Sequence, residues 1–93
     1  MNHESYIKKC IELAKKSESR KEVPVGSLLI IDNENIFEAH NSPINDEDPT
    51  SHAEINVIRK ACKKINNYRL NNATLYISLE PCIMCVGAIS EAR

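Results

Sequence analysis

Two segments of the chain carry hydrophobic residues at helical spacing. In residues 4–19 apolar positions return every third or fourth residue, with lysines between them, which predicts an amphipathic helix. Residues 52–65 show the same spacing and predict a second helix. Its apolar stripe contains Ile55, Ile58, Ala61, Cys62 and Ile65. Glu54 falls within this stripe, where a carboxylate is costly unless it is paired or has a use.

Between and after these helices the pattern changes to that of strands. An apolar, branched run over residues 23–31 predicts a buried strand, and a polar turn at 32–35 leads into a partner strand at 36–40. Residues 73–79 predict a third strand, and Pro81 opens a final helix. The order helix–strand–strand–helix–strand–helix predicts a single α/β domain over residues 1–93, in which helices pack on a sheet.

Composition narrows the class of protein. The chain has 93 residues, 42% of them hydrophobic and 27% charged, with a net charge of −1, which is typical of one small globular domain. Basic residues are dense in both predicted helices; a solvated helix face is the simpler interpretation, and a nucleic-acid-binding patch is the alternative. No signal peptide or membrane-length apolar stretch is present, so we expect a cytoplasmic protein without a membrane partner.

Two short motifs carry the chemistry. His52-Ala53-Glu54 stands at the start of the second predicted helix, and Pro81-Cys82-Ile83-Met84-Cys85 stands at the start of the last. One histidine and two cysteines can hold zinc and leave the fourth tetrahedral position open, as in catalytic zinc sites. A glutamate beside such a site can move protons. This pair of motifs is the known signature of zinc-dependent nucleobase deaminases.

The predicted helices place these groups together. Cys82, Cys85, Val86 and Ile89 share one helix face, so both thiols lie on one side of the first turn. Two helix N-termini converging over the strand ends would form an electropositive pocket, where open α/β sheets tend to bind ligands. Cys10 and Cys62 fall in apolar stripes and are interpreted as core residues. His3 and His40 are interpreted as surface or loop residues rather than ligands.

Each motif also has a purely structural interpretation. Ser51 and Glu54 have the spacing of a helix capping box, in which the serine caps the helix and the glutamate reaches back to it. A lone Cys-x-x-Cys can be a redox pair, although the preceding Pro81 and the lack of a thioredoxin-like βαβ unit weaken that interpretation. The two motifs together, each at a predicted helix start, favour the metal site.

Beyond the metal motif, the chain resembles the bacterial tRNA-specific adenosine deaminases of the cytidine-deaminase-like superfamily. The matching stretches are residues 22–26 (EVPVG), Asn41, 48–50 (DPT), 52–54 (HAE), 67–70 (NYRL), 73–76 (ATLY) and 79–85 (LEPCIMC). The resemblance implies a three-layer α-β-α cytidine-deaminase-like fold and conversion of adenosine to inosine at the tRNA wobble position. It also implies a homodimer that binds the tRNA anticodon stem-loop.

The resemblance further assigns roles to single residues. His52, Cys82 and Cys85 match the ligands of one zinc ion per chain, and Glu54 matches the proton shuttle. Asn41 matches a residue that contacts the target base. Val25 and Ala53 match positions that line the base pocket, and the adjacent Gly26 is consistent with a ligand or backbone approaching closely.

The chain departs from the family in length. Family members continue with two more strands and further helices, so we expect a C-terminally truncated form of the fold with three strands and three helices. Two other functions stay open. One is a deaminase of free guanine or cytosine, which shares both metal motifs. The other is an inactive zinc-stapled fragment or binding module, which would hold zinc and deaminate nothing.

Overall fold

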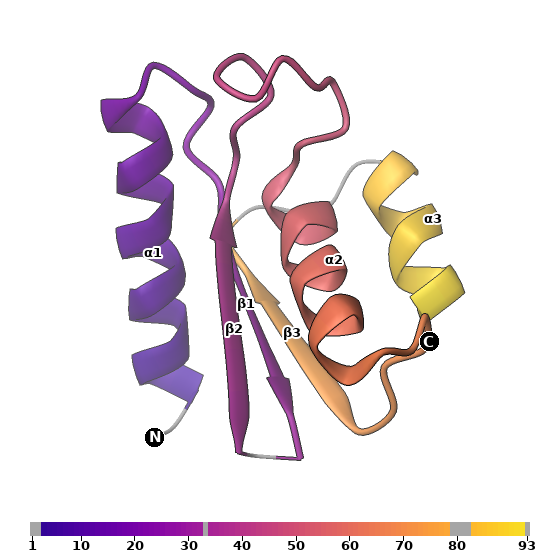
Figure 1. The fold of residues 1–93 in the computed structure, drawn as a ribbon. Helices are drawn as coiled ribbons and strands as arrows, with labels where there is room; N and C mark the ends of the chain where they lie inside the picture. Colours follow the sequence, from indigo (N-terminus) through magenta and orange to yellow (C-terminus); the bar gives the residue numbers. More distant parts are fainter. Residues whose placement is uncertain (1–2, 33, 79–82, 93) are drawn as a thin grey trace.

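Strand β1 (Gly26–Ile31) is the central strand of a three-stranded sheet with the order β2-β1-β3 (Figure 1). The computed structural model describes residues 3–32, 34–78 and 83–92. Both β2 (Asn35–His40) and β3 (Ala73–Ile77) run antiparallel to β1. Gly26 pairs with His40 and Ile31 with Asn35, which is the predicted hairpin. Among the described residues β3 pairs only with β1.

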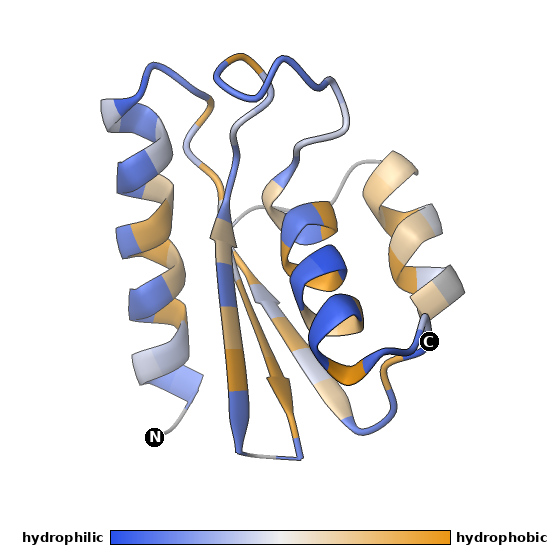
Figure 2. Cartoon of the chain, in the orientation of Figure 1, coloured by the Kyte–Doolittle hydropathy of each residue, from blue (hydrophilic) through white to orange (hydrophobic). Residues whose placement is uncertain are grey.

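Helices cover both faces of this sheet. Helix α1 (His3–Ser19) lies on one face, and α2 (Ala53–Ile65) and α3 (Ile83–Ala92) lie on the other, which makes three layers (Figure 1). Figure 2 shows that α1 and α2 each carry a hydrophilic and a hydrophobic side, whereas α3 is largely apolar. The predicted α/β architecture with helices packed on a sheet is confirmed.

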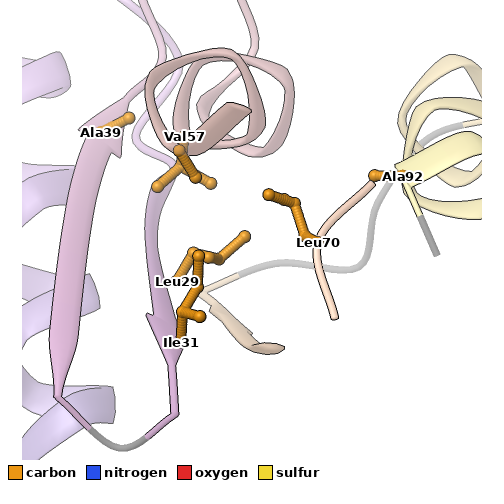
Figure 3. Close-up of a cluster of buried hydrophobic side chains, with 7 residues drawn as sticks. Leu29, Ile31, Ala39, Val57, Leu70 and Ala92 are labelled. Carbon is orange, nitrogen blue, oxygen red and sulfur yellow. The ribbon is translucent and has the colours of Figure 1, made fainter. Parts of the chain in front are cut away.

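Alternate residues of β1 supply the two cores. Leu28 and Ile30 pack with Cys10 and Leu13 under α1. On the opposite face, a larger cluster joins the sheet to α2 and α3 (Figure 3). Its buried members are Leu29, Ile31, Ala39, Val57, Ala61, Leu70 and Ala92. All six residues of β1 are buried because both faces of the sheet are covered, which explains the largely apolar run in its sequence.

The contact between α1 and β1 depends on Gly26. A Cβ atom at this position would lie 2.7 Å from the Ala14 backbone nitrogen and closer still to the Cys10 carbonyl oxygen. The backbone of Gly26 has no positive φ angle, so the requirement is one of space. The glycine therefore marks the close approach of the α1 backbone rather than that of a ligand.

Several predicted boundaries and faces are corrected. The first strand begins at Gly26 and not at Val23, whose side chain is 62% exposed. The third strand ends at Ile77, and predicted residues Leu79 and Pro81 lie outside the described residues. Ile65 and Val86, which we expected on buried faces, are 37% and 52% exposed. Ile65 is the last residue of α2, where the chain turns away through a left-handed Asn66.

Within the described part of the chain, no helix is both long enough and apolar enough to cross a membrane.

Candidate metal centre

His52 is the N-cap residue of α2, and its extended backbone turns the chain from a loop into the helix. The first helical N–H, that of Ala53, donates a hydrogen bond to Asn41 Oδ1 over 2.9 Å. Asn41 directly follows β2, so a residue from the end of the sheet caps the helix. The imidazole of His52 makes no capping hydrogen bond to the backbone of α2.

The capping-box interpretation of Ser51 and Glu54 is wrong. Ser51 lies one residue before the cap, and its hydroxyl donates to Asp46 Oδ2 over 2.6 Å within the loop. Glu54 Oε1 makes no hydrogen bond to any described residue. Asn41 caps the helix instead. The local sequence did not show this role, because only the fold brings Asn41 next to the start of α2.

Ser27 is a second support of α2 that the sequence analysis missed. Its fully buried hydroxyl donates to the Ala53 carbonyl over 2.6 Å. Ser27 is the one hydroxyl residue in the apolar run Gly26–Ile31, and a lone serine in a strand buried on both faces was the signal available. Ala53 is thus held through its N–H by Asn41 and through its carbonyl by Ser27.

Glu54 is buried in the first turn of α2, with 4% of its surface exposed. Its position within the buried stripe of the helix is confirmed. The Oε1 atom lacks a hydrogen-bond partner among the described residues. Leaving a buried carboxylate oxygen unpaired is costly, so such an atom marks a site that accommodates a ligand.

Cys85 is the side chain of α3 that meets His52. Its sulfur is fully buried and lies 3.5 Å from His52 Nδ1. Zinc bonds of about 2.05 Å to nitrogen and about 2.3 Å to sulfur, at a tetrahedral angle, place the two ligand atoms about 3.6 Å apart. The observed separation fits a shared zinc ion. Cys82, the third predicted ligand, lies outside the described residues.

The other two described cysteines belong to the cores. Cys10 is 1% exposed in the cluster under α1, and burial raises the pKa of its thiol to about 11. Cys62 packs against the larger cluster, and burial raises the pKa of this thiol as well. Metal ligation requires the thiolate, which burial in apolar surroundings disfavours. Their interpretation as core residues is confirmed.

Neither of the other histidines joins the site. His3 opens α1, and its ring is hydrogen-bonded to the Tyr76 hydroxyl on β3. His40 ends β2, and its Nδ1 atom lies 3.2 Å from both Ser17 Oγ and the Asn41 carbonyl oxygen. Both rings are therefore engaged elsewhere.

The structure also joins the residues expected to meet the substrate. Val25 is 8% exposed, and its carbonyl accepts a hydrogen bond of 2.9 Å from the Asn41 N–H. The Asn41 side chain then reaches Ala53, which is fully buried. Val25, Asn41 and Ala53 thus form a hydrogen-bonded series that ends one residue from His52 and one from Glu54. Their contact with a base stays a prediction.

Comparison with known proteins places this site in a family. Residues 1–93 match the family described as the cytidine and deoxycytidylate deaminase zinc-binding region. The chain belongs to this family. Membership accounts for the His-x-Glu motif of α2 beside Cys85 of α3, and it identifies the domain as a zinc-binding deaminase domain. The cytidine-deaminase-like fold expected from the sequence is confirmed.

Among curated relatives, the chain is similar to two proteins named tRNA-specific adenosine deaminase. The alignment with the protein of Buchnera aphidicola subsp. Baizongia pistaciae shows 52% identity over 91 residues. It covers 97% of this chain and 56% of the relative. The alignment with the protein of Haemophilus influenzae shows 50% identity over 91 residues and covers 97% of this chain and 53% of the relative. Guanine deaminase of Bacillus subtilis is 43% identical to the chain over 94 residues. This alignment covers 100% of this chain and 60% of the relative.

Solved structures show the same two kinds of relative. One comes from work on A-to-I editing by tRNA:A34 deaminases at the wobble position of transfer RNA. It is 41% identical to the chain and superposes with a TM-score of 0.94. The match covers 98% of this chain and 66% of that structure's chain. Guanine deaminase from B. subtilis also has a TM-score of 0.94, at 42% identity, with 100% and 60% covered. The chain therefore spans between about half and two thirds of the length of these relatives.

Proposed function

We propose that this domain deaminates adenosine to inosine at the wobble position of a tRNA, as part of a cytoplasmic, homodimeric enzyme with one zinc ion per chain. The observation that carries the proposal is the placement of Glu54. Its buried carboxylate, with Oε1 unpaired among the described residues, lies two residues after a histidine whose Nδ1 is at zinc-ligand distance from Cys85.

The residues present fit the metal. His52 and Cys85, with Cys82 as the third, would hold zinc through one nitrogen and two sulfurs. Bound there, zinc supplies Lewis-acid activation of a water molecule for attack on the substrate. The N-termini of α2 and α3 add the positive ends of two helix dipoles, which favours ligation by thiolate.

Glu54 moves the protons of the reaction. Its carboxylate takes a proton from the attacking water and delivers it to the ring nitrogen next to the carbon under attack. The carbon–nitrogen bond to the exocyclic amine then breaks, and the amine leaves as ammonia with a second proton passed through Glu54. Water and adenosine thereby give inosine and ammonia. Burial of Glu54 keeps bulk water from competing for these transfers.

Asn41 is suited to orient the base. Its Oδ1 accepts from the Ala53 N–H, so the amide nitrogen is the group that can donate to an acceptor on the substrate. Val25 and Ala53, both buried beside it, would provide apolar walls. In this arrangement the residue that caps α2 also aligns the base with Glu54.

The choice of tRNA over a free base rests on the relatives. The proteins 52% and 50% identical to the chain are named tRNA-specific adenosine deaminases, against 43% for the guanine deaminase. The EVPVG and NYRL stretches favour the same substrate. Deamination of free guanine is the second candidate, because the two solved structures superpose equally well, with TM-scores of 0.94.

A comparison of two substrates tests the proposal. Zinc-loaded protein is incubated with an anticodon stem-loop that carries adenosine at the wobble position, and separately with guanine, and inosine and ammonia are measured. The proposal expects inosine in the stem-loop and no ammonia from guanine. Ammonia from guanine alone would establish the second candidate. Zinc-loaded, folded protein that deaminates neither substrate would identify a zinc-binding module.

A further inference from the structure

A groove of about 420 Å³ lies along the outer edge of β2, between α1 on one face of the sheet and α2 on the other. It is formed by residues other than those of the metal centre. The lining side chains that concern us are Lys16, Arg20, His40, Ser42 and Lys60. We propose that this groove is a second, non-catalytic binding site that takes a phosphate group.

The charges of the groove favour an anion. Lys16 and Arg20 form no ion pair with any described residue, and the Lys60 ammonium donates to a backbone carbonyl, that of Glu38, over 2.7 Å. The two carboxylates that line the groove have other partners. Glu38 lies 3.6 Å from Lys9, and Asp46 accepts the Ser51 hydroxyl. The lining therefore carries three cations and two acids, a surplus of one positive charge, and Arg20 also acts electrostatically on the Glu22 carboxylate outside the groove.

Ser42 gives an independent sign of a ligand. The residue lines the groove and is 4% exposed, and its hydroxyl finds no hydrogen-bond partner in the described part of the chain. Buried hydroxyls are normally paired, because leaving one without a partner costs about 1–3 kcal/mol. The Oγ atom is itself buried, so the Ser42 side chain would rotate toward the groove for a phosphate oxygen to accept this hydroxyl and complete its hydrogen bonding.

His40 adds a nitrogen to the same wall. The Ser17 hydroxyl donates to the Asn41 carbonyl over 2.7 Å, so its hydrogen is already used. His40 Nδ1, 3.2 Å from both oxygens, must then carry the proton and donate to them. His40 thus lines the groove as a ring whose Nδ1 is engaged with the neighbouring backbone and hydroxyl.

The groove and the metal centre lie on opposite sides of one short segment. His40 and Ser42 line the groove, whereas the side chain of Asn41 between them turns to the N-terminus of α2. This alternation is the geometry of an extended chain, in which successive side chains point to opposite sides. The groove is therefore a separate site and not an extension of the substrate pocket.

Phosphate chemistry has two sources at this size. A volume near 420 Å³ is within the range of pockets that hold small molecules, which is the size class of a mononucleotide. A phosphodiester of a polynucleotide presents the same oxygens and would lie along the open edge. Both ligands present the same phosphate oxygens to the groove. They differ in the length of the nucleotide chain attached to that phosphate.

Nuclear magnetic resonance titration of the 93-residue chain tests the site. Inorganic phosphate, uridine 5′-monophosphate and hexauridylate are added at constant ionic strength, and the Ser42 amide and the His40 ring are followed. Saturation by phosphate or by the mononucleotide indicates a small-molecule site, and saturation by hexauridylate alone indicates a phosphodiester contact. Failure of all three ligands to saturate these signals would overturn the proposal.

Variants separate a built site from general attraction. Lys16→Gln and Arg20→Gln are each expected to weaken binding about fivefold, the loss of one exposed charge contact. Ser42→Ala should weaken it by a similar factor through loss of one hydrogen bond, without loss of charge. Lys15→Gln, on α1 but outside the groove, is the matched control. Equal weakening by Lys15→Gln and Lys16→Gln, or unchanged binding in Ser42→Ala, would contradict a site at this groove.

Discussion

Asn41 Oδ1 accepts the backbone N–H of Ala53 over 2.9 Å, so the end of the sheet caps the helix that carries His52 and Glu54. Two demands meet at this side chain. Its oxygen holds the helix, and its nitrogen is the group proposed to meet the base. Substitutions that keep one of these functions and remove the other can separate them.

Asn41→Asp and Asn41→Ala form such a pair. Aspartate still accepts from Ala53 N–H at a helix N-terminus, so we expect it to retain most of the stability. Alanine loses the cap and should lower the free energy of unfolding by about 1 kcal/mol. Both should lose deaminase activity. Urea unfolding and inosine formation measure the two effects, and full activity in Asn41→Asp would show that the amide nitrogen does not contact the base.

The two glycines should respond in opposite directions to alanine. Gly26→Ala places a Cβ against the backbone of α1 and should destabilise the protein by about 3 kcal/mol, because backbone cannot move aside as a side chain can. Gly87→Ala, in α3, meets nothing within 4 Å and should stabilise by about 0.5–1 kcal/mol. Chemical unfolding of both variants tests the packing of α1 on β1. A mild effect of Gly26→Ala would mean that α1 lies further away.

Glu22 should make stability depend on pH in the acid range. Burial tends to raise its pKa, but hydrogen bonds from Asn45 and Ile44 and the charge of Arg20 outweigh it, and the pKa is lowered from its usual 4.5. A lowered folded-state pKa means that the stabilisation is present above the unfolded value and is lost as pH falls through the folded value. Glu22 holds the loop before α2 through Ile44 N–H and Asn45 N–H.

Thermal unfolding between about pH 6 and pH 3 measures this contribution. Glu22→Gln should show a smaller fall in Tm over this range than the unsubstituted protein. Glu34→Gln, at an exposed glutamate, controls for the loss of one charge. Equal falls in Tm for Glu22→Gln and the unsubstituted protein would show that Glu22 does not carry the dependence.

Zinc binding should distinguish among the cysteines. Cys85→Ser is expected to lower zinc content and to remove the increase in Tm on zinc addition, because metal binding to the folded state adds to its stability. Cys62→Ser, at a half-buried core thiol, should keep the zinc content and the increase in Tm on zinc addition. Metal analysis and thermal unfolding with and without a chelator give the two readouts. Loss of zinc in Cys62→Ser but not in Cys85→Ser would move the site to another part of the chain.

Local sequence predicted most of the elements because local physics determines them. The apolar spacing of α1 and α2 and the mostly apolar sequence of β1 gave these elements their types and most of their bounds. The start of β1 was placed too early because Val23 and Val25 extend the apolar run, although Val23 is exposed. Propensity does not record where pairing with a neighbouring strand begins.

The residues of the candidate metal centre were proposed from sequence, whereas the hydrogen bonds that support it were not. His52, Glu54 and Cys85 follow from motif spacing, because each stands near a helix start. The cap from Asn41 and the hydrogen bond from Ser27 to Ala53 connect segments distant in sequence, and only the fold reveals them. The local alternative, a capping box from Ser51, was wrong because Asp46 takes that hydroxyl.

The most direct test of the account compares zinc-loaded protein with zinc-loaded Glu54→Gln. Inosine formation is followed in an anticodon stem-loop with adenosine at the wobble position, and zinc content is measured in both proteins. The account predicts equal zinc content, with a rate about 10²–10⁴-fold lower in the variant, since glutamine keeps the shape and cannot carry the proton. A variant within about tenfold of the unsubstituted protein would contradict the assignment of Glu54 as the proton carrier.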